Sequence, residues 1–186
     1  MEIVTNEVST KTKWSIDTSH SEIGFKVKHL MIANVRGRFT EFDASIYTTT
    51  ENFSSVEIDC WINPASIDTN DKKRDEHVKS ADFFDVENFK EINFTGDTYN
   101  RIDDDESYEL WGELTIKGVA KKIKLIVEFG GMIQDPWGNL KAIFTITGKI
   151  NRKDFGLNWN SDLKAGGILV SNEVWINCEV QLMKVK

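Results

Sequence analysis

Residues 55–62 read SVEIDCWI, and this stretch indicates the fold because its apolar residues occupy alternate positions. Successive side chains of a β-strand point to opposite faces, so a period of two predicts a strand with one buried face and one wet face. The apolar face would carry Val56, Ile58, Cys60 and Ile62. The opposite face would carry Glu57, Asp59 and Trp61.

The same alternation recurs along most of the chain. It is clearest in 23–27, 108–116, 123–129 and 174–182, with turn-forming residues at 95–107, 118, 130–139 and 164–167. In the run VRGRFTEFDASIY the apolar parity changes, which predicts a bulge between Gly37 and Phe42. We expect about eight or nine strands between Trp14 and Val185, and therefore an all-β protein. Periodicity alone leaves a sandwich and a barrel open.

One segment has a helical pattern instead. The sequence predicts a helix over residues 71–81, capped by Asp68 or Thr69. It is followed by two adjacent aromatic residues, Phe83 and Phe84, before the chain returns to strand alternation at 91–94. The two rings could plug the end of a sheet or roof an apolar cavity.

Length and charge limit the possible functions. A chain of 186 residues predicts a single domain, which we place at 13–186 after a loosely attached tail at 1–12. The net charge of −7, with both signs mixed along the chain, disfavours nucleic acid and would be repelled by an anionic membrane. The sequence shows no signal-peptide pattern and no apolar run of about 20 residues, so we expect a cytoplasmic protein without stable membrane insertion.

Catalytic and metal-binding motifs are weak in this sequence. His20, His29 and His77 have no metal-ligand spacing, and His20 fits a turn. Cys60 and Cys178 lie in alternating apolar runs, which predicts a reduced, non-catalytic pair. The chain contains no GxSxG or phosphate-binding loop, and the acidic residues at 103–107 read as a solvated hairpin tip. We expect no metal and no cofactor. Two carboxylates from distant strands could still form a glycosidase-type catalytic pair.

Aromatic residues gather at inward positions and near predicted strand ends. This set could form a packed core or line a ligand cavity. Its members are Phe25, Phe39, Phe42, Phe83, Phe84, Phe94, Phe129, Phe144, Phe155 and Trp159.

Five segments, in this order and at these spacings, resemble the YceI family of lipocalin-like, polyisoprenoid-binding proteins. They are WSIDTSHSEIGFKVKHLMIANVRGRF (14–39), RDEHVKSADFF (74–84), INFTGD (92–97), GELTIKGVAKKIKL (112–125) and INRKDFGLNW (150–159). The resemblance runs from about Trp14 to the C-terminus. It implies an extended eight-stranded antiparallel barrel with one short helix near its mouth. It also implies a tunnel that holds a polyisoprenoid or another amphiphilic lipid, quinone-like or fatty-acyl.

The resemblance and the inward parity together give a set of candidate ligand-binding residues. They are Phe25, Phe39, Phe42, His77, Phe83, Phe84, Phe94, Leu114, Ile116, Val127, Phe144, Arg152, Asp154, Phe155 and Trp159. Among them His77, Arg152 and Asp154 are candidates for polar groups at the mouth. Arg152 and Asp154 could instead form a strand-end ion pair. We expect one ring of Phe83 and Phe84 to enter the tunnel while the other anchors the lid.

The main functional hypothesis is a non-enzymatic lipid carrier or store. A second hypothesis is an enzyme acting on a lipid or quinone inside the barrel, which would require a polar pair such as His77 and a carboxylate on the tunnel wall. A third is a ligand-free barrel whose outward tryptophans form a partner or homodimer surface. Those tryptophans are Trp61, Trp111 and Trp175.

Overall fold

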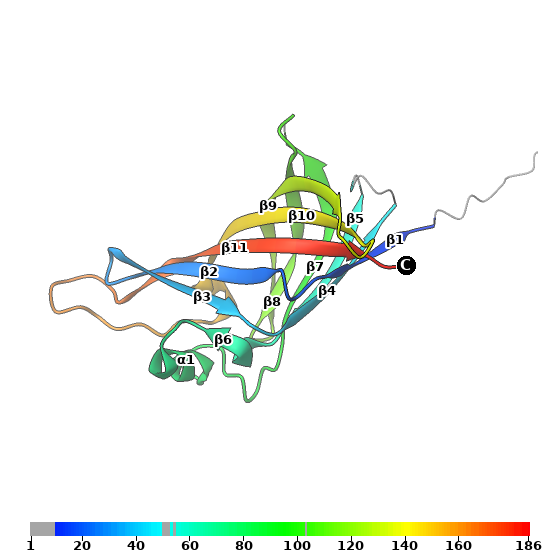
Figure 1. Cartoon of the computed structure of the whole chain (residues 1–186). Coiled ribbons are helices and arrows are strands. Elements are labelled where there is room, and N and C mark those ends of the chain that lie inside the picture. Colours follow the sequence, from blue (N-terminus) through cyan, green and yellow to red (C-terminus); the bar gives the residue numbers. More distant parts are fainter. Residues whose placement is uncertain (1–9, 50–52, 54, 103) are drawn as a thin grey trace, which may run out of the picture.

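The structure is a computed structural model, and it describes residues 10–49, 53, 55–102 and 104–186. Figure 1 shows a barrel of long, curved strands with one helix beside one end. The elements are β1 (Thr12–Ile16), β2 (Glu22–His29), β3 (Ala33–Phe39), β4 (Phe42–Thr48), β5 (Val56–Ile62), η1 (Pro64–Ser66), β6 (Ile67–Asp68), α1 (Lys72–Lys79), β7 (Ile92–Arg101), β8 (Ser107–Ile116), β9 (Val119–Gln134), β10 (Leu140–Asn151), η2 (Arg152–Phe155) and β11 (Val170–Lys184).

Eight strands close into an antiparallel barrel. Their order is β1, β4, β5, β7, β8, β9, β10 and β11, and β11 pairs back with β1 through partners such as Trp14 and Lys184. Closure leaves no free edge within this ring, which is the usual solution for an antiparallel sheet of this size. The eight-stranded barrel with one short α-helix is therefore confirmed for the described residues.

The first two long strands of the barrel are each interrupted. β1 pairs with β4 and β2 pairs with β3, so these four segments form one long hairpin with breaks at 17–21 and 40–41. The predicted bulge between Gly37 and Phe42 is wrong, because the parity change marks the break between β3 and β4. At this break the backbone N–H of Thr40 donates to the Ser66 carbonyl (3.1 Å), and the N–H of Glu41 donates to Ser66 Oγ (3.0 Å).

Two predicted turns are shorter than expected, because strands continue into them. β7 runs on to Arg101, which leaves 102–106 as the connection to β8. β9 runs on to Gln134, and Gly130 is the extra residue of a bulge there, since Phe129 pairs with Phe144 and Gly131 with Ile143. Gly131 has φ +119°, a conformation that side chains disfavour, and this explains the glycine pair within a strand.

The helix is shorter than the predicted 71–81 and has a different cap. Asp71 is the N-cap, and its side chain accepts hydrogen bonds from the N–H groups of Lys73 (3.0 Å) and Arg74 (3.1 Å). Asp68 and Thr69 are not available for capping, because Asp68 belongs to β6 and Thr69 binds the Asp75 carboxylate.

Each strand directs its apolar face into the barrel. In β5 the ends of that face, Val56 and Ile62, are buried, whereas Glu57 is exposed. Of the predicted tail, residues 1–9 lie outside the described residues, and Thr12 is already the first residue of β1. Within the described chain, no helix is long and apolar enough to cross a membrane.

Candidate functional site

The barrel encloses an apolar cavity of about 710 Å³. Side chains from every strand line it, because the inward parity of each strand is almost continuously apolar. A volume of this size falls in the range of sites that hold small molecules. The interior is thus large enough for a ligand in addition to the side chains that surround it.

Inward glycines allow aromatic rings to lie against the wall. A Cβ at Gly37 would overlap the Phe25 ring, and a Cβ at Gly112 would overlap the Phe94 ring. Each ring therefore occupies the place of a missing side chain on the neighbouring strand, instead of projecting across the lumen. This packing gives the cavity an aromatic wall without filling it.

An aromatic cluster closes the end of the cavity remote from α1. Phe53, in the β4–β5 connection, lies 4.8 Å from Trp14 and 5.0 Å from Phe144 between ring centroids. The Trp14 indole N–H donates to Thr48 Oγ1 at 3.1 Å, which satisfies its polar atom in a fully buried position. Strand parity did not indicate Phe53, because this residue lies outside the alternating runs.

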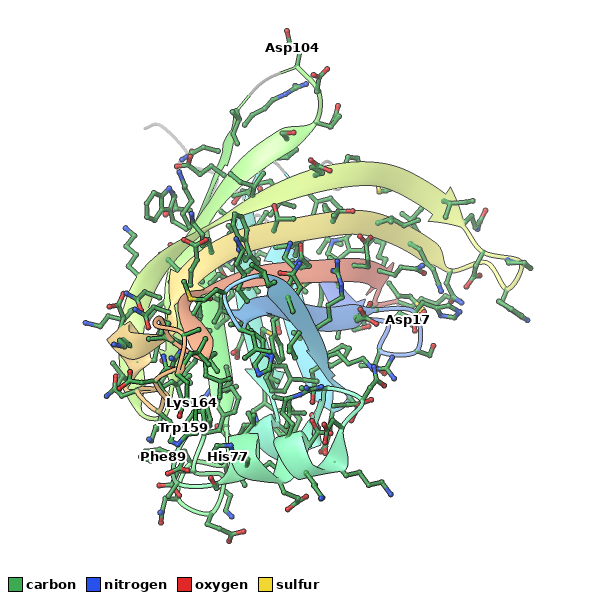
Figure 2. All side chains as sticks on the ribbon, turned by 90° about the vertical axis from the view of Figure 1, so that its left-hand side faces the viewer. Asp17, His77, Phe89, Asp104, Trp159 and Lys164 are labelled. Atoms are coloured by element: carbon green, nitrogen blue, oxygen red, sulfur yellow. The ribbon has the colours of Figure 1, made fainter. Side chains whose placement is uncertain are left out.

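Polar groups gather at the opposite end, which we call the mouth. The histidine and charged residues among the described cavity-lining set are His29, Asp71, Lys73, Arg74, His77 and Arg152. They lie on the end of β2, on the β6–α1 segment and at the end of β10. Figure 2 shows His77 and Trp159 close together beside α1, with Asp104 of the β7–β8 connection far away at the other end of the barrel.

The start of α1 is fixed by a buried polar network. Asp75 is 9% exposed, and one of its oxygens accepts the backbone N–H (2.9 Å) and the hydroxyl (2.6 Å) of Thr69. The Arg74 guanidinium donates to the hydroxyl and the carbonyl of Thr69, at 2.8 and 2.7 Å. Arg74 is therefore held rigidly at the mouth, although sequence reasoning did not select it.

His77 contributes one edge of an aromatic group. Its ring meets Trp159 and Phe83 edge-on, at centroid distances of 4.5 and 5.3 Å. Its Nε2 lies 2.7 Å from an oxygen of Asp82, whose side chain is half exposed. The carboxylate beside His77 is therefore on the outer surface and not on the cavity wall, where the enzyme hypothesis would need it.

Arg152 anchors the segment that follows β10. The guanidinium is 3% exposed and donates to the carbonyls of Leu157 (2.5 Å), Trp159 (2.9 Å), Val170 (3.3 Å) and Ser171 (2.9 Å). The predicted ion pair with Asp154 is absent from the described residues. Asp154 is exposed because the chain winds into η2 at this point, where strand parity no longer applies. Burial lowers the pKa of Arg152, which remains a cation held by backbone dipoles.

One further polar atom lies deep in the barrel. Tyr99 lines the cavity and stacks on Tyr108 with centroids 4.4 Å apart. Its hydroxyl is buried without a hydrogen-bond partner in the described structure, and burial raises the pKa of Tyr99. The sequence placed Tyr99 in a turn, so this group was missed. It is available to a polar group of a ligand.

The two thiols are also on the cavity wall. Cys60 and Cys178 both line the cavity as free cysteines. Burial raises the pKa of Cys60 to about 12 and that of Cys178 to about 11, so both stay protonated at neutral pH.

A family model described as a YceI-like domain matches residues 14–182. The chain belongs to the YceI-like family. A UPF0312 protein of Staphylococcus aureus (strain MSSA476) is 35% identical to it over 164 residues, which cover 88% of this chain and 92% of the relative.

Solved YceI-like structures share the barrel. A crystal structure of the Campylobacter jejuni YceI protein matches with a TM-score of 0.70 at 32% identity, over 91% of this chain and 96% of that one. A polyisoprenoid-binding domain from Saccharophagus degradans, described as implicated in plant cell wall breakdown, matches with a TM-score of 0.67 over 92% of this chain and 98% of that one. Its identity is 15%, so this second likeness concerns the fold alone.

Most of the predicted ligand-binding residues line the cavity of this YceI-like barrel. They are Phe25, Phe39, His77, Phe83, Phe84, Phe94, Leu114, Ile116, Val127, Phe144, Arg152 and Trp159. Phe42, Asp154 and Phe155 do not line it. Phe42 is buried at the start of β4 beside the strand break, and Phe155 is buried in η2, outside the strand register.

The predicted division of labour between Phe83 and Phe84 is wrong, because both side chains line the cavity. They lie in the turn at 81–84, where the geometry of helical faces does not apply. Phe83 is 9% exposed and packs on Trp159 with centroids 5.4 Å apart. Phe84 is less buried, and its ring meets the Phe39 ring edge-on with centroids 5.9 Å apart.

Lysine side chains lie over two of the three outward tryptophans, Trp111 and Trp175. Lys122 and Lys124 lie over Trp111 at 5.5 and 5.8 Å, and Lys149 lies over Trp175 at 4.9 Å. These cation–π contacts occupy ring faces that the third hypothesis would assign to a partner.

Proposed function

We propose that this YceI-like protein binds an amphiphilic lipid with a long apolar tail, of the polyisoprenoid, quinone or fatty-acyl type, and carries or stores it without chemical change. The observation that supports this most directly is the distribution of groups around the cavity. The long barrel interior is apolar, whereas the charged and histidine side chains among the described lining residues lie at the mouth. The tail would occupy the barrel and the head group would lie near Arg74 and His77.

Burial of an apolar tail can supply enough free energy for binding. Each buried methylene contributes about 0.8 kcal/mol, so ten of them give about 8 kcal/mol, which corresponds to a dissociation constant of about 1 μM. Freezing the rotors of the tail reduces this gain. The domain from Saccharophagus degradans that shares this fold is described as polyisoprenoid-binding, and the proposal extends that class of ligand to this chain.

The experiment is native mass spectrometry of the freshly purified protein, followed by extraction and mass analysis of any lipid. Delipidated protein would then be titrated with a fluorescent polyprenyl probe. Ala44→Phe places a ring in the lumen from a cavity-lining position, and Ser45→Phe places the same ring on the outer side of the same strand. We expect Ala44→Phe to weaken probe binding by about tenfold or more and Ser45→Phe to leave it unchanged. A protein that carries no lipid and does not bind the probe would refute the proposal.

A further inference from the structure

The turn between β2 and β3 exposes three consecutive apolar residues, which we call the tip: Leu30, Met31 and Ile32. Their exposed fractions are 47%, 54% and 89%. Leu30 and Met31 have φ values of +54° and +68°, which bulky residues rarely adopt and which hairpin turns usually assign to glycine or asparagine. Exposure and backbone strain both oppose folding at this point. A role in binding explains why such residues stand there.

The tip is joined to a second loop at the mouth. The Leu30 N–H donates to the Leu169 carbonyl at 2.9 Å, and the Met31 side chain lies over Gly167. His29, directly before the tip, and Leu169 line the cavity. In Figure 1 the β2–β3 turn and the 157–169 segment project together beyond the barrel, at the end that carries α1.

The hairpin that carries the tip is basic in an acidic protein. Residues 23–40 contain Lys26, Lys28, Arg36 and Arg38 and no aspartate or glutamate, whereas the whole chain has a net charge of −7. Lys28 and Arg36 are exposed, and the strand register places Lys26 opposite Arg36 on the outward side of the hairpin.

Three acidic residues beside the hairpin have basic partners, and one of those partners, Arg38, belongs to the hairpin itself. Glu22 and Asp68 both pair with Arg38, at 3.6 and 3.5 Å, at the base of the hairpin. Glu173, on the adjacent strand, pairs with Lys149 at 3.1 Å. On the 157–169 segment Asp162 is two residues from the cation Lys164, which lies above Trp159 in the view of Figure 2.

We propose that the tip inserts into the interface of an anionic phospholipid bilayer, with Lys28 and Arg36 against the head groups, so that the mouth faces the membrane. The apolar side chains match the acyl-chain boundary of such a surface, and the flanking cations match its anionic head groups. The overall negative charge repels the rest of the molecule from the same surface, which selects the mouth end as the docking face. This inference goes beyond the proposed function, because a barrel with an empty cavity would dock equally well.

The test is co-sedimentation with vesicles of phosphatidylcholine and phosphatidylglycerol, and with vesicles of phosphatidylcholine alone. The wild-type protein should sediment with the anionic vesicles, and less so as salt is raised. Met31→Gly/Ile32→Ser should reduce the partition coefficient by about tenfold or more, because two apolar side chains no longer enter the bilayer. Both positions are exposed and glycine suits the positive φ, so this variant should fold.

Matched controls separate the tip from general effects. Trp137→Ser removes an exposed apolar side chain (80% exposed) from the β9–β10 turn and should leave vesicle binding unchanged. Lys28→Glu/Arg36→Glu should abolish binding, whereas Lys121→Glu/Lys153→Glu, with the same change in charge at exposed sites elsewhere, should not.

Insertion has its own readout. Ile32→Cys can be labelled at neutral pH with an environment-sensitive dye, because the native thiols line the cavity and have raised pKa values. Its emission should shift to the blue with anionic vesicles.

Four outcomes would overturn the proposal: no sedimentation of the wild type, sedimentation of the tip variant at the wild-type level, emission of the labelled tip that stays typical of water, or an effect of the tip variant on self-association alone. Retention of lipid in the tip variant is measured in parallel. If the wild-type protein retains lipid in its cavity but does not bind vesicles, the docking proposal is refuted. If it binds vesicles but never holds lipid in its cavity, only the proposed function is refuted.

Discussion

Replacing Arg152 by methionine tests how the mouth is held. The guanidinium is almost completely buried and donates to four backbone carbonyls, three of them at 2.9 Å or less. Each hydrogen bond from a charged donor contributes about 1.5–3 kcal/mol, and desolvation of the cation offsets a large part of that sum. Methionine approximates the volume of the side chain and removes every donor. We expect a loss of about 3–5 kcal/mol in the free energy of unfolding.

Urea unfolding monitored by tryptophan fluorescence gives this quantity from the midpoint and the slope. Lys153→Met is the matched control, because Lys153 is the exposed neighbour in η2, and its effect should stay within about 0.5 kcal/mol. Arg152→Lys keeps the charge but replaces a planar fork by a compact ammonium, so it should recover only part of the loss.

A second readout follows from the partners of Arg152, which belong to the segment that carries Trp159. Freeing this segment should speed release of a fluorescent lipid probe in Arg152→Met and leave it unchanged in Lys153→Met. If Arg152→Met and Lys153→Met have the same unfolding free energy, the anchoring role is refuted.

Three further predictions concern other parts of the molecule. Leu114→Glu puts a carboxylate on the cavity wall, so it should lower the free energy of unfolding by several kcal/mol and abolish lipid retention. Glu113→Lys, outward on the same strand, should change the free energy of unfolding by about 0.5 kcal/mol or less. Equal tolerance of the two changes in urea unfolding and lipid extraction would show that the faces of β8 are reversed. Phe83→Ala should lower the free energy of unfolding by about 3–5 kcal/mol, because this ring is 9% exposed, and Phe84→Ala, at a less buried ring, should lower it by less. Both variants should speed probe release, because both rings line the cavity; thermal melting and probe dissociation check this, and release at the wild-type rate by both variants would contradict a role at the mouth. Burial by itself would raise the pKa of Asp17, but hydrogen bonds from Lys141, Ser19 and His20 hold it well below its usual range. The stability that Asp17 contributes is therefore present above about pH 4 and is lost as pH falls below that value. Asp17→Asn should weaken the dependence of the unfolding free energy on pH, measured by urea unfolding down to about pH 3, and an unchanged slope of unfolding free energy against pH would rule Asp17 out as its source.

Strand parity carried most of the fold prediction. The alternation at 55–62 and its repeats located the strands, since only one face of each is buried. Barrel closure came from the resemblance to a family, because pairing between β1 and β11 leaves no mark in a local pattern. The break at Thr40 and Glu41 looked like a bulge because both features shift parity by one residue. The partner that distinguishes them, Ser66, is distant in sequence.

The candidate site was predictable where it is made of strands. Parity alone assigned Leu114 and Val127 to the inward face of their strands, and both line the cavity together with Phe94. Parity fails once the chain leaves the strand, as at Asp154 in η2. Arg152 was selected for the right location but the wrong contacts, because carbonyl partners carry no sequence signal.

The pairing of β1 with β11 also constrains the order of folding. Trp14 pairs with Lys184, so contacts between nearly the two ends of the described chain complete the barrel. Loop-closure entropy must be overcome before these contacts form, and topologies dominated by distant pairings fold slowly. A nascent chain cannot complete the ring until β11 has left the ribosome, and until then the apolar wall is open to solvent. We therefore expect barrel closure to be a late step of folding, which a bound lipid would favour by covering the same wall.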